Sequence, residues 1–472
     1  MTGPLHADQG RLVVVANRTP PIESADAAPA VGGLTSALVP ALEAVPGSLW
    51  FGWSGHTSVR AERPLLETRR VGSLRVVAVD LPATDVEAFY NGFCNRSLWP
   101  LLHSFTDRFR AEASEYERYR SVNRLFALLL SRRLRPGDRV WIHDFHLIPL
   151  ATELRALGFE GPIGFFLHVP FPPHDVFSIL PWADELLRDL LNYDLVGFHT
   201  RAYQESYEHA LERELGEVPE HESGVYPIGI DPELHASWAQ EPLGKRRGKE
   251  LREAVRGGSL VLAVDRLDYT KGIVQRLRML ERFFESHPDW RGRVSVLQVS
   301  APTRTRVQEY VRQRRDVEEL VGRVNGRFGE PDWVPIRYAF RAYSPRELAA
   351  FYREADVCLV TPLRDGMNLV AKEFVAAQTG DPGVLVLSRF AGAAETLHDA
   401  LLVNPYDADG TARVLARALT MPVSERAARQ AALLESVHQW TAARWRERFL
   451  ADLAEAAKKR AEDNVLAGVA RH

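Results

Sequence analysis

The chain has 472 residues, of which 46% are hydrophobic and 26% charged, and its formal net charge is −3. This length is too great for one hydrophobic core and predicts two large domains or about three smaller ones. The small negative charge argues against a general nucleic-acid or membrane-surface binder, so any phosphate must be held by a local group of arginines. Cys94 and Cys358 are the only cysteines, which excludes a disulfide framework. With no signal-peptide pattern and no run of apolar residues long enough to span a bilayer, we expect a cytoplasmic protein.

Short β-rich runs alternate with helical patterns along the chain. In the first half we expect strands at Arg11–Ala16, Leu49–Trp53, Leu74–Val79, Arg139–His143, Ile163–His168 and Leu195–His199. In the second half we expect them at Leu260–Val264, Val294–Val299, Ile336–Phe340, Val357–Thr361, Val384–Ser388 and Leu401–Asn404. The intervening helical patterns include Glu112–Arg132, Gln275–Ser286 and Pro345–Glu354. Nearly continuous apolar strands separated by helices predict two doubly wound α/β units, each with a parallel sheet covered on both faces.

A polar span between Asp231 and Gly258 is expected to separate the two units. This gives a first domain at 1–235, joined by a C-terminal helix at about 441–472, and a second domain at 236–440. Trp445, Phe449 and Leu453 lie at helical spacing in that last helix and are expected to pack, whereas the tail from Lys458 is expected to fray. Ligands of open α/β sheets bind beyond the carboxyl ends of the strands, so two such units predict a cleft.

The strand ends of the first half carry several groups suited to binding. Arg18 ends the first strand, where a guanidinium can grip phosphate, and Gly32-Gly33 precedes a helical pattern and permits close approach to a diphosphate. Asp144 follows the strand Arg139–His143 and is interpreted as a hydroxyl acceptor. The neighbouring His143 and His146 lack further ligands at zinc-site spacing, so we expect no bound metal. His168 precedes a Pro-rich loop and is interpreted as heading it.

The strand ends of the second half carry more positive charge. Arg266 and Lys271 share the loop after the strand Leu260–Val264 and suit a leaving diphosphate, although a salt-bridged loop with Asp265 and Asp268 would also account for them. Arg304 closes the next strand. Asp365-Gly then joins the strand Val357–Thr361 to a helix that contains Lys372 and Glu373, a corner that favours phosphate at the helix N-terminus and ribose at the carboxylate. Together these groups predict a sugar-nucleotide site.

Several longer motifs resemble those of the trehalose-6-phosphate synthases, retaining glycosyltransferases of family 20 with the two-domain GT-B fold. The resemblance runs from about Arg11 to about Leu453. It is carried by Val-Ala-Asn-Arg18, Leu-Trp-Phe-Gly-Trp-Ser-Gly55, Trp-Ile-His-Asp-Phe-His146, Phe-Leu-His-Val-Pro-Phe-Pro172, Arg-Leu-Asp-Tyr-Thr-Lys-Gly272 and Thr-Pro-Leu-Arg-Asp-Gly-Met-Asn-Leu-Val-Ala-Lys-Glu373.

The resemblance implies a role for individual residues. The phosphate of glucose 6-phosphate is expected at Arg18, Tyr90 and Arg304, and its hydroxyls at Asp144, with Trp53 and Trp99 beside this acceptor pocket. The donor glucose is expected between His168 and Asp365. The rest of the sugar nucleotide is expected at Gly32, Gly33, Arg266, Lys271, Tyr343, Asp365, Leu369, Val370, Ala371, Lys372 and Glu373.

The implied reaction transfers glucose from a nucleoside-diphosphate glucose to glucose 6-phosphate with retention of configuration. UDP is the expected nucleotide, and the residues leave GDP and ADP open. Arg266, Lys271, His168 and Asp365 are the expected catalytic residues, with no cofactor and no catalytic metal. No nucleic-acid or membrane partner is expected, and a homo-oligomer stays open. Two alternatives also stay open: another phosphorylated acceptor, such as glycerol 3-phosphate or a pseudo-sugar phosphate, and a non-catalytic sugar-phosphate sensor that kept the fold.

Overall fold

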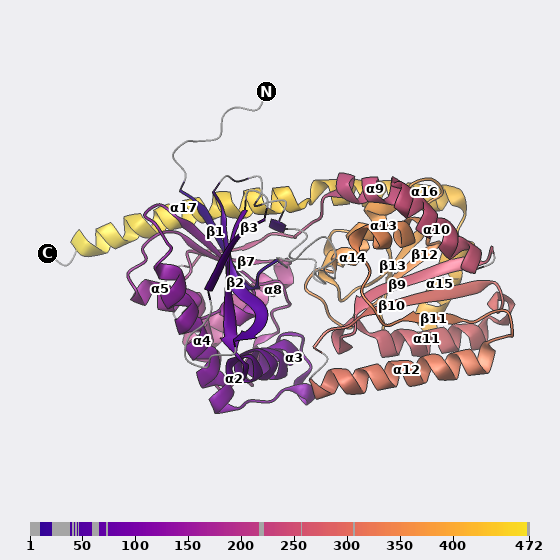
Figure 1. Ribbon diagram of the computed structural model, residues 1–472, viewed down its shortest axis with the longest axis horizontal. Coiled ribbons are helices and arrows are strands. Elements are labelled where there is room, and N and C mark those ends of the chain that lie inside the picture. The colour runs from indigo at the N-terminus through magenta and orange to yellow at the C-terminus, as the bar shows by residue number, and fades with distance from the viewer. Residues whose placement is uncertain are drawn as a thin grey trace, which may run out of the picture. The chain divides into compact units, whose positions relative to one another are not determined.

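The structure is a computed structural model that describes residues 10–20, 38–39, 42, 45, 47–58, 66–71, 74–216, 221–255, 257–304 and 307–469 (Figure 1). The chain folds into two compact units. The first contains the strand β1 (Leu12–Arg18) together with Leu38–Tyr226 and Arg444–His472, and the second contains Pro227–Ala443. The chain thus passes between the units at Tyr226 and Pro227, ahead of the boundary expected at 235.

The first unit is built on a sheet in the order β3-β4-β2-β1-β5-β6-β7-β8, in which only β3 runs antiparallel to its neighbour. The strands are β1 Leu12–Arg18, β2 Leu49–Ser58, β3 Leu66–Val71, β4 Leu74–Pro82, β5 Arg139–His143, β6 Ile163–Phe166, β7 Leu195–Phe198 and β8 Ser223–Val225. The order reverses between β1 and β5, so the crevice beyond their carboxyl ends is a topological switch point.

The helices of the first unit follow the strands in alternation. They are α2 Ala83–Asp85, η1 Val86–Leu98, α3 Trp99–Leu102, η2 Thr106–Arg108, α4 Ala113–Ser131, η3 Phe145–Leu147, α5 Leu150–Ala156, α6 His174–Phe177, α7 Ala183–Leu190, α8 Arg201–Leu215 and α17 Ala442–Val469. The two faces of β6 are covered by residues that lie far apart in the sequence. Phe165 packs on Tyr193, which follows α7, whereas Phe166 packs on Phe449 of α17.

The second unit is an all-parallel sheet in the order β11-β10-β9-β12-β13-β14. Its strands are β9 Ser259–Arg266, β10 Val294–Ala301, β11 Ile336–Ala339, β12 Val357–Val360, β13 Val384–Ser388 and β14 Leu401–Val403. The chain leaves β9 toward one edge and returns at β12 toward the other, so the switch point lies between β9 and β12.

Helices cover both faces of this second sheet (Figure 1). One face carries α11 Ile273–Ser286, α12 Gln308–Phe328 and α15 Ala408–Thr420, which share the hydrophobic core with the strands. The other carries α9 Pro232–Gln240, α10 Pro242–Ala254, α13 Pro345–Glu354, α14 Leu369–Ala377 and α16 Val423–Gln439. Short 3-10 turns complete the unit: η4 Tyr269–Lys271, η5 Pro288–Trp290 and η6 Gly392–Glu395.

All the expected strands are present, two other expectations are wrong, and two strands lie where none was expected. The polar span after Asp231 does not separate the units but forms the helices α9 and α10 of the second unit: Asp231 caps α9 by accepting from Leu234 N at 2.9 Å, and Pro232 occupies the first turn. The tail after Lys458 is not frayed, because α17 continues to Val469 and Arg460 donates to Asp194 at 2.9 Å. The strands β3 and β8 were not expected; both lie at sheet edges and lack an apolar run.

Among the helices of the described residues, none has an apolar stretch of the length that crossing a lipid bilayer requires.

Candidate functional site

Arg18 ends β1 at the switch point of the first sheet, where its guanidinium lies 4.5 Å from the centroid of the Trp53 ring. The Trp53 ring in turn contacts Tyr90 of η1 at a centroid distance of 5.3 Å. Desolvation lowers the pKa of Arg18, partly opposed by Tyr90, yet the residue is exposed. An exposed guanidinium held on an aromatic face is oriented for an anion from solvent. Arg18, Tyr90 and Trp53, which the sequence separates widely, therefore come together.

Gly55 makes room for this guanidinium. It has a φ of 95°, and a Cβ placed on it would lie 2.5 Å from an Nη atom and 2.6 Å from Cζ of Arg18. Any side chain here would be strained in its backbone and would displace the Arg18 guanidinium.

Asp144 follows β5, next to β1, in a backbone conformation that is rare for a residue with a side chain. Its φ is 75°, its N–H donates to the Phe166 carbonyl at 2.8 Å, and its carboxylate accepts from His168 N at 3.3 Å. The following turn is held by Tyr119, whose hydroxyl donates to the Phe145 carbonyl at 2.8 Å. The carboxylate of Asp144 is therefore fixed at the same sheet edge as Arg18.

Two aromatic side chains flank this turn. His146 stacks on Tyr90 at a centroid distance of 6.0 Å, which joins the Asp144 loop to the Arg18 cluster. Trp99, at the start of α3, is buried and packs on His103 and Phe145 at centroid distances of 4.2 and 5.8 Å. The sequence alone does not predict this contact between His146 and Tyr90.

His168 follows β6 and is half-buried. Its Nε2 lies 3.0 Å from Nδ1 of His143, and its ring lies 5.4 Å from that of His199 and 5.9 Å from that of Trp445. Desolvation, followed by the two neighbouring histidines, lowers the pKa of His168 well below its usual value. His168 is therefore a neutral ring near neutral pH.

In the second unit, the loops after β9 and β12 meet at the switch point. Lys271 Nζ lies 2.5 Å from Oδ2 of Asp365, and Asn368 Nδ2 donates to the same oxygen at 2.9 Å. The loops are also joined by their backbones, because Leu363 N donates to the Thr270 carbonyl at 2.7 Å. Sequence reasoning placed Lys271 and Asp365 at one site without predicting that they pair.

A second cluster lies beside this pair. Arg304 Nη1 donates to Asp268 at 3.2 Å, and Tyr310 donates to the same carboxylate at 3.1 Å. Burial would raise the pKa of Asp268, but Arg304, Arg266 and Lys271 outweigh this and lower it. Asp268 is fully buried and ionised; Arg304 contacts it directly, and the charges of Arg266 and Lys271 favour its ionised form. The structure thus places Arg304 among the cations of the second unit.

The helix α14 begins directly after Asn368, which leaves the N–H groups of Leu369, Val370 and Ala371 in its first turn. The next two residues differ. Lys372 is fully buried and its ammonium donates to the Ile228 carbonyl at 2.7 Å, so its side chain does not face a ligand. Glu373 is half-buried, and Tyr352 donates to its carboxylate at 3.0 Å.

Tyr343 lies between β11 and α13, where its ring contacts Phe351 at 5.0 Å and the Arg341 guanidinium at 4.2 Å. Because β11 is the edge strand of its sheet, Tyr343 follows a strand two places away from β9. Gly32 and Gly33 lie outside the described residues.

Strained backbone marks the same places. Within the part of the chain that the structure describes, four residues other than glycine have positive φ: Ser104, Asp144, Arg304 and Asn368. Three of these four belong to the clusters above. Such conformations are costly and concentrate where function requires a fixed geometry.

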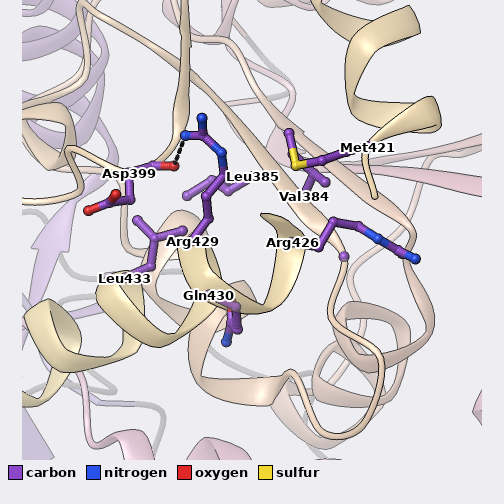
Figure 2. A pocket seen from close by; sticks show the side chains of 9 residues that line it. Val384, Leu385, Asp399, Met421, Arg426, Arg429, Gln430 and Leu433 are labelled. Carbon is purple, nitrogen blue, oxygen red and sulfur yellow. Dashed lines mark hydrogen bonds between the residues drawn. The ribbon is translucent and has the colours of Figure 1, made fainter. Parts of the chain in front are cut away.

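A pocket lies elsewhere in the second unit, at the amino-terminal end of β13 (Figure 2). Two of its arginines form hydrogen bonds with backbone carbonyls of the protein: Arg429 donates to the Asp399 carbonyl at 2.9 Å, and Arg426 donates to the Pro382 carbonyl at 3.2 Å. It lies at the wrong end of the strand to join the candidate site. Within the described ranges, no group of three or more His, Cys, Asp or Glu is placed to hold a metal ion.

Comparison with known proteins identifies the family of this chain. Residues 10–455 match the family described as Glycosyltransferase family 20. The chain belongs to this family. A trehalose-6-phosphate synthase of Sinorhizobium fredii is 46% identical over 462 residues, which cover 94% of this chain and 98% of that protein. The chain shares its GT-B fold with solved trehalose-phosphate synthases.

Two solved structures are similar to this family 20 chain at 40% identity. One is a UDP-forming α,α-trehalose-phosphate synthase of Burkholderia xenovorans in complex with glucose 6-phosphate, with a TM-score of 0.89 over 94% of this chain and 100% of that one. The other is an Escherichia coli protein bound with UDP-2-fluoro glucose, with a TM-score of 0.88 over 94% of this chain and 99% of that one.

Proposed function

We propose that this glycosyltransferase transfers glucose from UDP-glucose to glucose 6-phosphate with retention at the anomeric carbon, giving trehalose 6-phosphate and UDP. The observation that carries the proposal is the Lys271–Asp365–Asn368 cluster, which lies at the start of α14 and at the switch point of the second sheet. Backbone N–H groups and cations at such a place suit a diphosphate. The ligands of the two solved relatives support UDP-glucose as donor and glucose 6-phosphate as acceptor.

The donor is assigned to the second unit. Arg266 and Lys271 stabilise the charge that develops on the diphosphate as the glucosyl bond breaks. The first-turn N–H groups of Leu369 to Ala371 contribute to the same anion, and Glu373, oriented by Tyr352, takes the ribose hydroxyls. Asp365 is assigned to hydroxyls of the donor glucose rather than to nucleophilic attack, because Lys271 and Asn368 already engage its carboxylate.

The acceptor is assigned to Arg18, Tyr90 and Arg304 for phosphate and to Asp144 for hydroxyls. In this assignment Arg304 exchanges its contact with Asp268 for one with phosphate. The reaction is then a same-face displacement: the bond from the anomeric carbon to the diphosphate oxygen breaks, the bond to the acceptor hydroxyl forms, and the hydroxyl proton passes to the leaving phosphate. The protein contributes positioning and charge stabilisation.

We further infer that the protein acts in the cytoplasm without a metal or other cofactor. Cys94 and Cys358 are both buried as free thiols, which suits a reducing compartment. Positive charge for the leaving diphosphate is supplied by side chains.

The test is UDP release from UDP-glucose with glucose 6-phosphate or glycerol 3-phosphate as acceptor. We expect strong preference for glucose 6-phosphate, and we expect Asp144→Ala to impair transfer to it far more than any residual transfer to glycerol 3-phosphate. Preference for glycerol 3-phosphate, or equal loss with both, would favour the alternative acceptor. Binding of glucose 6-phosphate without UDP release would favour the sensor.

A further inference from the structure

His143 is a buried histidine that none of the roles above uses. It ends β5, is fully buried, and its Nδ1 lies 3.0 Å from Nε2 of His168. Its other nitrogen, Nε2, is also buried and has no hydrogen-bond partner in the described part of the chain. The rings of Trp141 and Trp445 lie 4.5 and 6.0 Å from its own ring. The contact with His168 is thus the one polar contact of this ring that the structure shows.

Both rings are neutral at physiological pH. Burial lowers the pKa of His143 to about 3, and it lowers the pKa of His168 well below its usual value. Each neutral ring carries one N–H, so one of the two facing nitrogens donates and the other accepts. Two arrangements satisfy the contact, and they present opposite chemistry to a ligand.

The unpaired Nε2 of His143 decides between them. If His143 accepted from His168, its own proton would reside on Nε2, as a buried N–H without an acceptor. If His143 donates from Nδ1, Nε2 carries only an unpaired lone pair. Buried N–H groups without acceptors are the rarer and more costly of these two defects.

We infer that His143 is a positioning residue: it donates its Nδ1–H to Nε2 of His168 and so fixes His168 as the tautomer protonated at Nδ1. The inference rests on the proposed function for its ligand, which is the sugar nucleotide. His168 then offers Nδ1–H as a donor to an oxygen of that substrate. It cannot serve as a general base, because Nε2 is occupied and Nδ1 bears the proton.

The backbone of His168 is held at the same place as its ring. Its N–H donates to Asp144 at 3.3 Å, and Asp144 follows His143 directly in the chain. The ring and the backbone of His168 are therefore both tied to the end of β5. A shift of His143 would be transmitted to His168 by two routes.

The direct test is ¹⁵N NMR of the full-length protein with labelled histidine, in which the two neutral tautomers have distinct nitrogen shifts. The His168 signals are assigned by their loss in His168→Gln. We expect protonated Nδ1 and unprotonated Nε2 in the wild type. Protonated Nε2 on His168 would overturn the inference, even if no substituted protein could be prepared.

Kinetics test the consequence. His143→Phe keeps a ring of similar size but removes the donor, and we expect it to lower kcat/KM for UDP-glucose about tenfold. The KM for glucose 6-phosphate should change less than twofold. His143→Asn places an amide N–H close to the position of Nδ1 and should recover most of the loss. Trp445→Phe is the matched control, since it alters packing 5.9 Å from His168 without removing the donor.

A purely structural role would raise KM for UDP-glucose and KM for glucose 6-phosphate alike, and Asn would then rescue no better than Phe. Either result, or unchanged kinetics in folded His143→Phe, would refute the positioning role. Failure of the proposed function has a different signature, because the wild type would then release no UDP while the NMR result still decides the tautomer.

Discussion

Arg18 offers a direct test of acceptor recognition, because its guanidinium can be removed, replaced or displaced separately. Arg18→Ala deletes a charge-assisted contact worth roughly 1.5–3 kcal/mol, which corresponds to an increase in KM for glucose 6-phosphate of about ten- to a hundredfold. Arg18→Lys keeps the charge but loses the planar group that lies 4.5 Å over Trp53, so it should fall between the wild type and Arg18→Ala.

The substitution Gly55→Ala is expected to displace the Arg18 guanidinium without changing Arg18 itself. It leaves the Arg18 side chain unchanged, but the new Cβ would lie within 2.5 Å of an Nη atom. We expect KM for glucose 6-phosphate to rise while KM for UDP-glucose stays within about twofold. Gly47→Ala is the matched control: Gly47 also has positive φ, at 78°, but nothing lies within 4 Å of the added Cβ.

Initial rates of UDP release over both substrate concentrations give the two KM values. Circular dichroism and thermal unfolding of each variant show whether it is folded. A wild-type KM for glucose 6-phosphate in folded Arg18→Ala would refute the role of Arg18. If Gly47→Ala raised that KM as much as Gly55→Ala does, backbone strain alone would explain the effect and the displacement of Arg18 would not.

Three other predictions concern Lys271, Lys372 and activity without a metal ion. Lys271→Ala should lower kcat about 10²–10³-fold by removing a cation from the leaving diphosphate, whereas the exposed Lys249→Ala should not; comparable turnover of both variants would contradict this. Burial lowers the pKa of Lys372 to about 7, so the unfolded state binds more protons between pH 7 and 10.5, and the stability of the folded state should rise with pH there by up to about 1.4 kcal/mol per unit. Denaturant unfolding of the wild type and Lys372→Met across this range should show a steeper pH slope in the wild type, and parallel slopes would refute the shift. Transfer should persist in EDTA, and a loss that only a divalent cation restores would show that a metal is required.

The sequence predicts the strands well because both sheets are buried on two faces. Continuous apolar runs such as Val13 to Ala16 and Val357 to Val360 predict central strands of a parallel sheet. The edge strand β3 escapes this reasoning: its sequence Leu-Glu-Thr-Arg-Arg-Val is largely charged, as suits an edge exposed to solvent.

Local sequence patterns do not predict which side chains meet at the ends of neighbouring strands. The contact between Lys271 and Asp365 spans 94 positions and arises only because β9 and β12 are neighbours in the sheet. The contact between His143 and His168 arises in the same way from β5 and β6. Lys372 shows a different limit: the motif predicts that this residue lies at the site, but it does not predict that the side chain is buried on α14 with its ammonium against the Ile228 carbonyl.

The charges at the candidate donor site also depend on a charge that no substrate would touch. Arg276 is buried on α11, where it donates to Thr361 at 2.9 Å and to Gln298 at 2.9 Å and lies 2.5 Å from Asp265. A buried ion pair seldom stabilises a fold beyond what apolar packing would give, and removing one partner leaves the other uncompensated. Its use here is geometric. Asp265 lies in β9, Gln298 in β10, and Thr361 directly follows β12, so one guanidinium ties together three neighbouring strands. Lys271 lies in the loop after β9, and Asp365 lies in the loop after β12. Because Arg276 holds these two strands together, the distance between Lys271 and Asp365 is fixed before any nucleotide binds, and the diphosphate meets a site that is already organised.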